Sequence, residues 1–409
     1  MVDTMALLPP FIRPTRMTRT PAPATGPPPA GLAADEEVLL DAPDDRLGPA
    51  LVAAARGAYG PAAHLLAGTR ERAQWEDRDG YTRRLAAFAG ARGEWLDAWR
   101  AAAPGDPDAL LLTAQLAVDR AWPSPARAEL LRGAGPLITA AARADDRDPV
   151  PWRVALDHAR GSRAGHRYFE ELWAAAVRRA PHHHGCHVAA LRYLATACCV
   201  PPGNTGPGSH SPDAPHHARG AHPLQRTSHA PQGSHAPQDS HAPQGSHAPQ
   251  GSHAPQGSHA PHGSHAPHRS QGSHGSLREC FDFADRAAQD APCDALVQGL
   301  PARVAFACLA DGGGPWVERS RLEAAADRAI ALSALVPAAT PRHAELRNLL
   351  AYVLVRLDRH EDALAQLRLT GPYATSFPWD RFSGDPLGLF LELRADVRSV
   401  PLTRAARTP

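Results

Sequence analysis

The chain of 409 residues contains no lysine, and its 43 arginines nearly balance its 42 acidic residues. This balance argues against a protein that binds nucleic acid through a strongly basic surface. Arginine differs chemically from lysine at bidentate or stacked sites. Because alanine is also abundant, codon usage in a GC-rich genome is the simpler explanation for the missing lysine.

Cysteines and long apolar runs are also scarce. The six cysteines include no CxxC pair, so we do not expect a disulfide scaffold. No apolar run approaches the roughly 18 residues that a membrane helix needs. The N-terminal residues also lack the apolar core and cleavage site of a secretion signal. We therefore expect a cytoplasmic protein with no membrane contact.

Aromatic residues make up only 6% of the chain, against 42 prolines and 33 glycines. Part of such a chain cannot bury enough apolar surface to fold. The segment 1–34 is rich in Pro, Thr and Arg, and we interpret it as a disordered tail. A second short tail is expected at 401–409.

A long insert interrupts the chain between 201 and 276. Seven consecutive hexads that begin Ser-His-Ala-Pro occupy 228–269, and the insert holds fourteen of the 23 histidines. The repeated prolines forbid a continuous helix, and the Gly and Ser beside them add flexibility. Replacing a short turn by such a segment costs only about 2–3 kcal/mol. We therefore expect an exposed, disordered insert that the helices on either side tolerate.

Helical patterns fill the two remaining parts, 35–200 and 277–400, where apolar residues recur three and four positions apart. In the segment 103–122, Asp106 and Asp108 stand where a helix would begin. The apolar face of that helix would be formed by Leu111, Leu112, Leu116 and Val118. No alternating strand pattern is present, so the sequence predicts an all-α fold.

The clearest helical pattern lies at 343–369, where the turn DRHED separates two helices. Its large and small residues resemble the packing positions of a tetratricopeptide (TPR) helical hairpin. These positions are Leu350, Ala351, Leu354, Ala363 and Leu367. The resemblance implies an irregular stack of antiparallel helical hairpins.

A longer stretch, from Trp75 to Ala284, resembles an uncharacterised bacterial family of degenerate TPR-like helical domains. The counterpart of that family's Gly-Ser-His turn would be 272–274, followed by Phe281, Phe283 and Ala284. The resemblance implies that 186–199 and 277–290 are the two arms of one hairpin and that the insert is an expansion of their turn. This family has no assigned chemistry, so the resemblance implies no catalytic residues.

Catalytic motifs are absent from the sequence: there is no GxSxG, Walker loop, GxGxxG or HExxH. We therefore name no catalytic residue and no cofactor, and we expect no enzyme. Acidic and basic residues alternate in RERAQWEDRD (70–79), which we interpret as a solvated helix surface.

The cluster HHHGCH (182–187) is the most specific candidate for metal binding. His183 and His187 would share one helix face, with Cys186 beside them. Cys198 and Cys199 lie about 16–20 Å further along a straight helix, so they cannot complete a site. Because the cluster begins a predicted helix, we favour surface histidines and name no metal ligand.

The eight tryptophans divide into two groups. Six occur among Leu and Ala at helical spacing and are expected in the core: Trp75, Trp95, Trp99, Trp122, Trp152 and Trp173. Trp316 and Trp379 lie in Pro- and Gly-containing loops and are expected nearer the surface. The aromatic segment 371–390 would cap the last hairpin, and a peptide-docking patch is the alternative.

These observations favour a non-enzymatic scaffold that binds a protein or peptide in the concave groove of stacked hairpins. The alternative is a metal-binding accessory protein that acts through the His-rich insert. An enzyme with a site assembled from scattered residues is a remote third reading.

Overall fold

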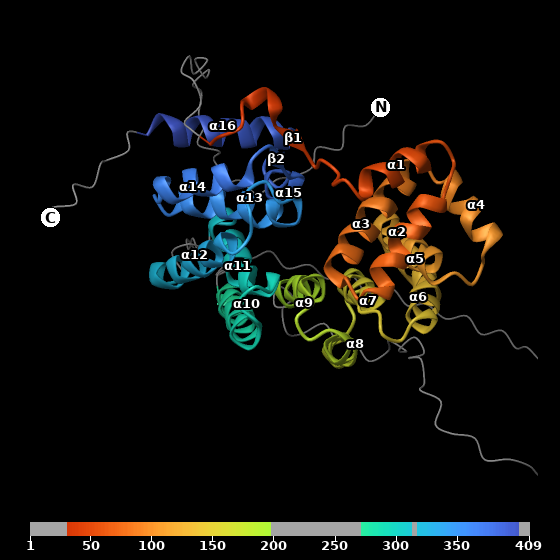
Figure 1. Cartoon of the computed structure of the whole chain (residues 1–409). Coiled ribbons are helices and arrows are strands. Elements are labelled where there is room, and N and C mark those ends of the chain that lie inside the picture. The colour runs from red at the N-terminus through yellow and green to blue at the C-terminus, as the bar shows by residue number, and fades with distance from the viewer. Residues whose placement is uncertain (1–30, 198–270, 313–316, 401–409) are drawn as a thin grey trace, which may run out of the picture. The chain divides into compact units, whose positions relative to one another are not determined.

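Sixteen α-helices supply nearly all the regular structure of the described residues, which are 31–197, 271–312 and 317–400 of a computed structural model (Figure 1). The only strands in these ranges are two of two residues each. The expected all-α class is confirmed. The expected tails and insert, as far as they cover 1–30, 201–270 and 401–409, lie outside the described residues.

The first part of the body contains η1 (Asp35–Glu37), β1 (Leu39–Leu40), α1 (Leu47–Ala55), α2 (Gly60–Glu71), α3 (Trp75–Ala91), α4 (Glu94–Ala102), α5 (Pro107–Ala121), α6 (Arg127–Ala144), α7 (Val150–Gly161), α8 (His166–Arg179) and α9 (His184–Ala197). The second part contains α10 (Gln271–Asp290), η2 (Leu296–Gly299), α11 (Leu300–Ala310), α12 (Arg319–Ala334), α13 (Pro341–Arg356), α14 (His360–Thr370), β2 (Tyr373–Ala374), α15 (Ser376–Trp379) and α16 (Pro386–Ser399).

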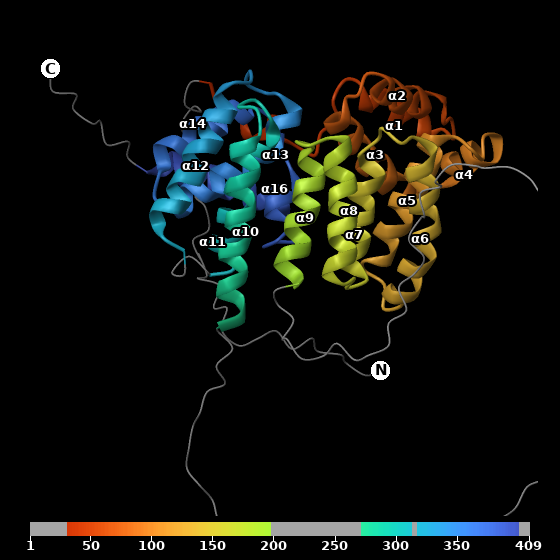
Figure 2. The same ribbon diagram turned by 90° about the horizontal axis from the view of Figure 1, so that it is seen from below.

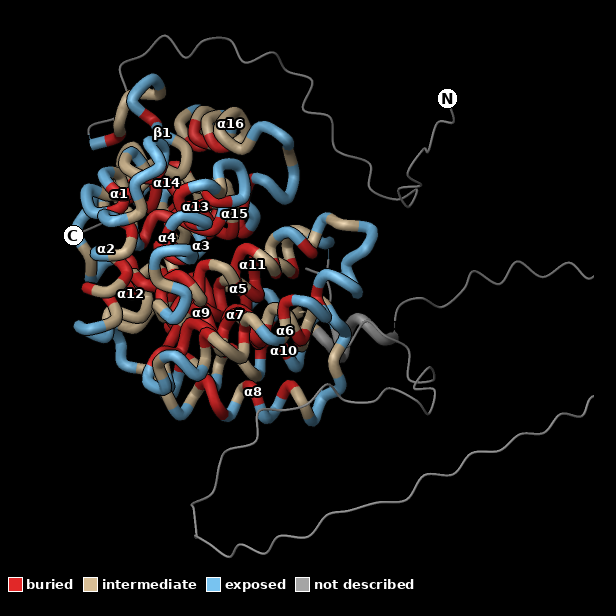
Figure 3. Tube along the Cα trace, turned by 90° about the vertical axis from the view of Figure 1, so that its right-hand side faces the viewer, coloured by how far each residue is buried: buried red, intermediate tan, exposed pale blue. Residues whose placement is uncertain are grey.

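Most helices pack against their neighbours in sequence, so the apolar core runs along the chain (Figure 2). One cluster joins α1 to α5, a second joins α5 to α9, and a third extends from α9 to α16. Buried and exposed stretches alternate along the helices, as the tube of Figure 3 shows. Helix α9 contributes to both the second and the third cluster, and it therefore connects the two parts of the body.

Helix α5 shows how the local sequence determines an element. The Asp106 side chain accepts hydrogen bonds from the N–H groups of Asp108 and Ala109, at 2.8 and 3.0 Å, and Pro107 occupies the first helical position. The four predicted apolar residues are buried. This expectation is confirmed.

Helices α13 and α14 form the hairpin that the sequence predicted at 343–369. The five positions with large and small side chains are all buried: Leu350, Ala351, Leu354, Ala363 and Leu367. The small alanines allow the two helices to approach each other, while the leucines fill the space between them.

Helices α9 and α10 contact each other although the insert separates them in sequence. This is the arrangement expected of two arms of one hairpin. Helix α10 begins at Gln271 and includes 272–274, where we expected a turn. Once packing of Phe281 has fixed this helix, extension towards the N-terminus costs little, and no proline lies between Pro267 and Phe281 to stop it.

The segment 32–42, which we call the N-terminal strap, packs against the last helices of the chain. Within it β1 pairs in parallel with β2, beside α16 (Figure 1). Leu32 and Val38 are buried in the third apolar cluster. Leu32 is packed in the core, so ordered packing begins before residue 34, where we expected the disordered tail to end.

Polar contacts fix both ends of the strap. The Arg394 guanidinium donates to the Ala33 carbonyl at 2.5 Å and lies 3.2 Å from the Asp35 carboxylate. At the other end, the Asp41 carboxylate accepts from the Ser376 N–H at 2.9 Å. These contacts join residues more than 300 positions apart in sequence.

The aromatic segment 371–390 is largely packed into the same core. Trp379 is only 1% exposed, and its indole N–H donates to the Asn348 side chain at 2.9 Å. The expectation that Trp379 lies near the surface is wrong, because α13 supplies a hydrogen-bond acceptor that lets the indole be buried. Trp316 lies outside the described residues. Of the six tryptophans expected in the core, Trp95 and Trp99 are buried, and the other four are half-buried.

We expect Arg394→Met to lower the free energy of unfolding by about 1–3 kcal/mol, because it leaves the Ala33 carbonyl without its donor while keeping an apolar stem. Urea unfolding followed by circular dichroism measures this change. Arg356→Met, on the exposed side of α13, is the matched control and should change stability little. Equal stability of the two variants would show that the strap contact contributes nothing.

Candidate functional site

A chain of buried ion pairs is centred on α3. Arg78 is fully buried between two carboxylates, 2.6 Å from Asp108 and 2.7 Å from Asp148. Its guanidinium also donates to the Leu66 carbonyl at 3.0 Å. One arginine therefore links α3 to α2, to α5 and to the turn that precedes α7.

The next residue along the helix, Asp79, is also buried, and here a carboxylate lies close to two arginines. Its Oδ1 accepts from Arg153 of α7 at 2.7 Å, and Arg83 lies 3.3 Å from its Oδ2. Burial alone would raise the pKa of Asp79, but these guanidinium groups hold it well below its ordinary value. The carboxylate therefore stays ionised inside the protein.

Helix α3 also supports the beginning of α9. The Glu76 carboxylate accepts from the His184 backbone N–H at 2.7 Å, which satisfies one of the free donors of a helix N-terminus. A Cβ at Gly185 would lie 2.4 Å from Asp79 Oδ2. Only glycine therefore lets α9 approach the Asp79 carboxylate this closely.

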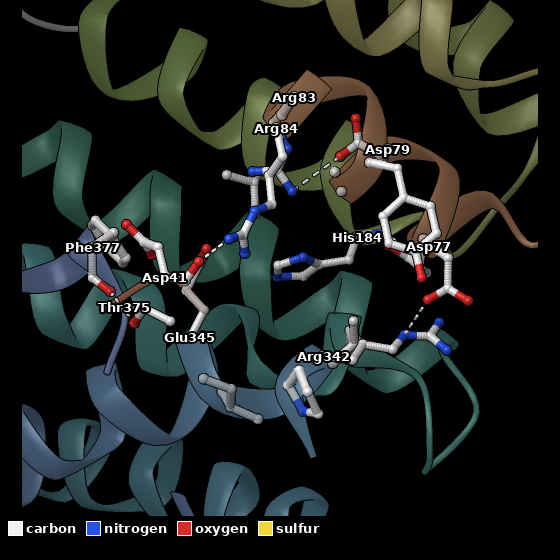
Figure 4. Close-up of a pocket in the computed structure, with 18 of the residues that line it drawn as sticks. Asp41, Asp77, Asp79, Arg83, Arg84, His184, Arg342, Glu345, Thr375 and Phe377 are labelled. Carbon is white, nitrogen blue, oxygen red and sulfur yellow. Dashed lines mark hydrogen bonds and ion pairs between the residues drawn. The ribbon is translucent and has the colours of Figure 1, made fainter. Parts of the chain in front are cut away.

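These elements surround a cleft of about 600 Å³ (Figure 4). Its walls come from α1, α3, α7, α9, α11 and α13 and from the segments around β1 and α15. Thirteen of the lining residues are charged. The arginines are Arg83, Arg84, Arg153, Arg192, Arg303 and Arg342, and the acids are Asp41, Asp44, Glu76, Asp77, Asp79, Asp157 and Glu345.

All seven carboxylates of the cleft have a partner. Asp41 accepts from Ser376, Asp44 from Tyr81 and Glu76 from the His184 N–H, while Asp77 pairs with Arg46 and Arg342, Asp79 with Arg83 and Arg153, Asp157 with Arg153, and Glu345 with Arg303. The pair formed by Arg342 and Asp77 is drawn in Figure 4. Every carboxylate of the cleft therefore has a partner within the chain, and four of the seven are paired with an arginine.

One arginine of the cleft differs from the others. Arg192 of α9 is exposed, and among the described residues its guanidinium has no hydrogen-bond or ion-pair partner. Arg83 is 48% exposed and shares Asp79 with Arg153. Arg192 is therefore the arginine of the cleft whose guanidinium is unpaired within the described ranges.

The ionisable groups near Arg192 have strongly shifted pKa values. Burial lowers the pKa of His184 to about 3, and the nearby Arg303 adds to this shift. Burial would raise the pKa of Glu345, but Arg303 and Arg83 lower it to about 2. At neutral pH this part of the cleft therefore holds a neutral imidazole and an ionised carboxylate.

The HHHGCH cluster was wrongly placed on the surface. His183 and His187 are only 2% and 4% exposed. His183 Nδ1 lies 3.1 Å from Cys186 Sγ, and His187 Nδ1 lies 3.0 Å from the His183 carbonyl. The rings are buried because the first turn of α9 is covered by α3, and His187 packs edge-on against Trp173.

No group of three or more His, Cys, Asp or Glu residues with the arrangement of a metal site occurs within the described ranges. Cys198, Cys199 and the His-rich segment 201–270 lie outside them. A metal-binding role of the insert therefore stays a prediction.

The segment RERAQWEDRD (70–79) was also misjudged, because its last two residues are buried rather than solvated. The sequence also did not predict the cleft. Its charged residues come from helices far apart in sequence, and none forms a motif. The available signal was the pair of adjacent opposite charges at Arg78 and Asp79 within a helical segment. Such a pair occurs both on solvated helix faces and in buried ion-pair networks.

Comparison with known proteins gives no relative: no family model, no curated protein and no solved structure matches this chain. The resemblance to TPR-like domains therefore stays a prediction. Among the described residues, no helix is both long and apolar enough to cross a bilayer.

We expect Asp79→Ala to lower the free energy of unfolding by about 3–5 kcal/mol, because it leaves Arg153 buried without its closest partner. Chemical denaturation at pH 7 measures the loss. The control is Asp97→Ala, which removes an exposed carboxylate 3.5 Å from Arg100 and should cost less than about 1 kcal/mol. A similar small loss for both variants would contradict a structural role of the network.

A second prediction concerns pH. Burial lowers the pKa of His187 to about 4, whereas the unfolded imidazole takes up its proton near pH 6.5. The unfolded state therefore binds more protons between these values, and stability that is present above pH 6.5 is lost as the pH falls towards 4. Urea midpoints at several pH values should show a shallower fall for His187→Gln than for wild type. The exposed His166→Gln should follow wild type, and a wild-type slope in His187→Gln would contradict this assignment.

Proposed function

We propose that this protein is a non-enzymatic scaffold whose helices form a TPR-like stack and whose cleft binds a peptide segment of a partner protein. The packing of hairpins on their sequence neighbours supports the stack, since such repeats bury their apolar faces against one another and leave an extended concave surface. The buried TPR-like positions of α13 and α14 support it locally.

The observation that carries the proposal is the composition of the cleft. Pockets for small molecules carry only a few polar groups, whereas thirteen charged residues line this cleft beside its apolar surface. Apolar side chains are interspersed with them, among them Leu51, Phe88, Leu346 and Leu349. A mixed lining of this kind suits a peptide, which presents polar backbone and side chains of several types at once.

The ionisable groups of the cleft favour binding over acid-base catalysis. A general acid or base works best with a pKa near the working pH. The pKa values of His184 and Glu345 lie at about 3 and 2, and burial and Asp44 raise that of Tyr81 well above its ordinary value. The pKa values of these three groups therefore lie far from pH 7.

The test is to fill the cleft. Ala87 is an exposed position of α3 that lines it, so Ala87→Trp should block the cleft without disturbing the core. We expect this variant to lose most binding to an array of acetylated, amidated random octapeptides, by more than about tenfold in affinity. Fluorescence anisotropy with selected peptides gives the affinities.

Ala128→Trp is the matched control, because Ala128 is an exposed alanine of α6 outside the cleft. It should bind peptides as wild type does. If wild type selects no peptide, or if both tryptophan variants bind equally well, the cleft is not a peptide site.

A further inference from the structure

Helix α9 presents a regular stripe to the cleft. The lining residues His184, Gly185, Val188, Ala189 and Arg192 follow helical spacing along one face. Between the imidazole and the guanidinium, which begin about 12 Å apart along the helix axis, the side chains are small. Gly185, Val188 and Ala189 are buried at the base of the cleft, and Arg192 is the exposed end of the stripe.

Arg192 lies close enough to Arg303 and Glu345 to influence the charge of both. Three guanidinium groups, those of Arg83, Arg192 and Arg303, line the same part of the cleft as the Glu345 carboxylate. Arg303 pairs with Glu345 and also stacks over the Phe377 ring, 4.4 Å from its centre. Arg303 is therefore occupied, and Arg83 pairs with Asp79 and is also attracted by Glu345. Arg192 has no hydrogen-bond or ion-pair partner among the described residues.

Electrostatics agree with this geometry. Burial lowers the pKa of Arg303 to about 10, Glu345 opposes the shift, and Arg192 and Arg83 add to it. Arg303 therefore experiences the positive charge of Arg192 and Arg83, whereas Asp79 raises the pKa of Arg83. An anionic group of a ligand would relieve this repulsion, and it would do so where the local carboxylates are already paired.

We propose that the peptide bound in the cleft presents an aspartate or glutamate side chain to Arg192, with Arg83 as the second donor. This inference rests on the proposed peptide-binding function and names the chemistry that the cleft selects. Guanidinium groups bind carboxylates through two parallel hydrogen bonds, and both arginines project accessible guanidinium groups into the cleft.

A carboxylate fits the charge of the site better than a phosphoryl group does. One guanidinium is unpaired, and a carboxylate carries one negative charge, whereas a phosphoryl group carries about 1.5 to 2 at neutral pH. His184 is neutral at this pH and therefore adds a hydrogen-bond donor but no charge. The nearby Glu345 carboxylate would repel a second negative charge.

The apolar wall defines the neighbouring position. Val188 of α9 and Leu346 and Leu349 of α13 also line the cleft. A ligand that places its carboxylate at Arg192 would lay an adjacent side chain against these residues. We therefore expect an apolar residue next to the acidic one.

The experiment uses the purified full chain and acetylated, amidated octapeptides with a central Leu-Glu pair and mixed flanking positions. Two matched libraries carry Leu-Gln and Leu-phosphoserine instead. We expect wild type to bind the Leu-Glu library at least about tenfold more tightly than the Leu-Gln library. This preference should weaken as salt is raised.

Arg192→Ala should abolish the preference for glutamate, while Arg192→Lys keeps the charge but loses the two-pronged geometry and should retain part of it. Arg132→Ala removes an exposed arginine of α6 outside the cleft and should keep it in full. Because Arg192 is exposed and unpaired, its replacement should leave the melting temperature unchanged, which separates a binding effect from misfolding.

The outcomes are distinguishable. A preference for the phosphoserine library would overturn the carboxylate assignment. Equal binding of the Leu-Glu and Leu-Gln libraries, still lost in Ala87→Trp, would refute the acidic ligand while leaving the peptide site intact. Failure of wild type to bind any library would refute the peptide site itself.

Discussion

The buried ion pairs of α3 are the constraint on which the rest of the site depends. Arg78 and Asp79 are neighbours in sequence with opposite charge, and each is satisfied by a different set of helices. Removing either charge would leave its partner buried and uncompensated. Helices α2, α5 and α7 are therefore held in one arrangement around α3. Fully paired buried charges select a single arrangement of helices more strictly than apolar packing does.

The same helix determines where α9 begins. Glu76 caps the first turn of α9, and Asp79 lies against Gly185, so the position of α9 follows from that of α3. Since α9 also packs against α10, the first part of the body orients the second. The N-terminal strap adds a second connection, through Asp41 at Ser376 and Arg394 at Ala33.

Between these two connections lies the cleft, and its charges are of two kinds. Those on the acidic side serve the fold, because each carboxylate is paired within the chain. Arg192 differs, since its guanidinium has no hydrogen-bond or ion-pair partner among the described residues. An unpaired guanidinium that lines a cleft is free to form hydrogen bonds with a ligand. The proposed acidic peptide follows from this difference.

The sequence by itself determined the helices. Apolar spacing predicted α5, α13 and α14, and a capping aspartate marked the start of α5, because these features depend on neighbours within a few residues. Tertiary structure alone decided which charges are buried. Arg78 meets Asp148 seventy positions away, and Arg153 meets Asp79 at a similar separation. An arginine in a helical segment has the same local pattern whether it faces water or a distant carboxylate, so only the packing of the helices distinguishes Arg78 from Arg192.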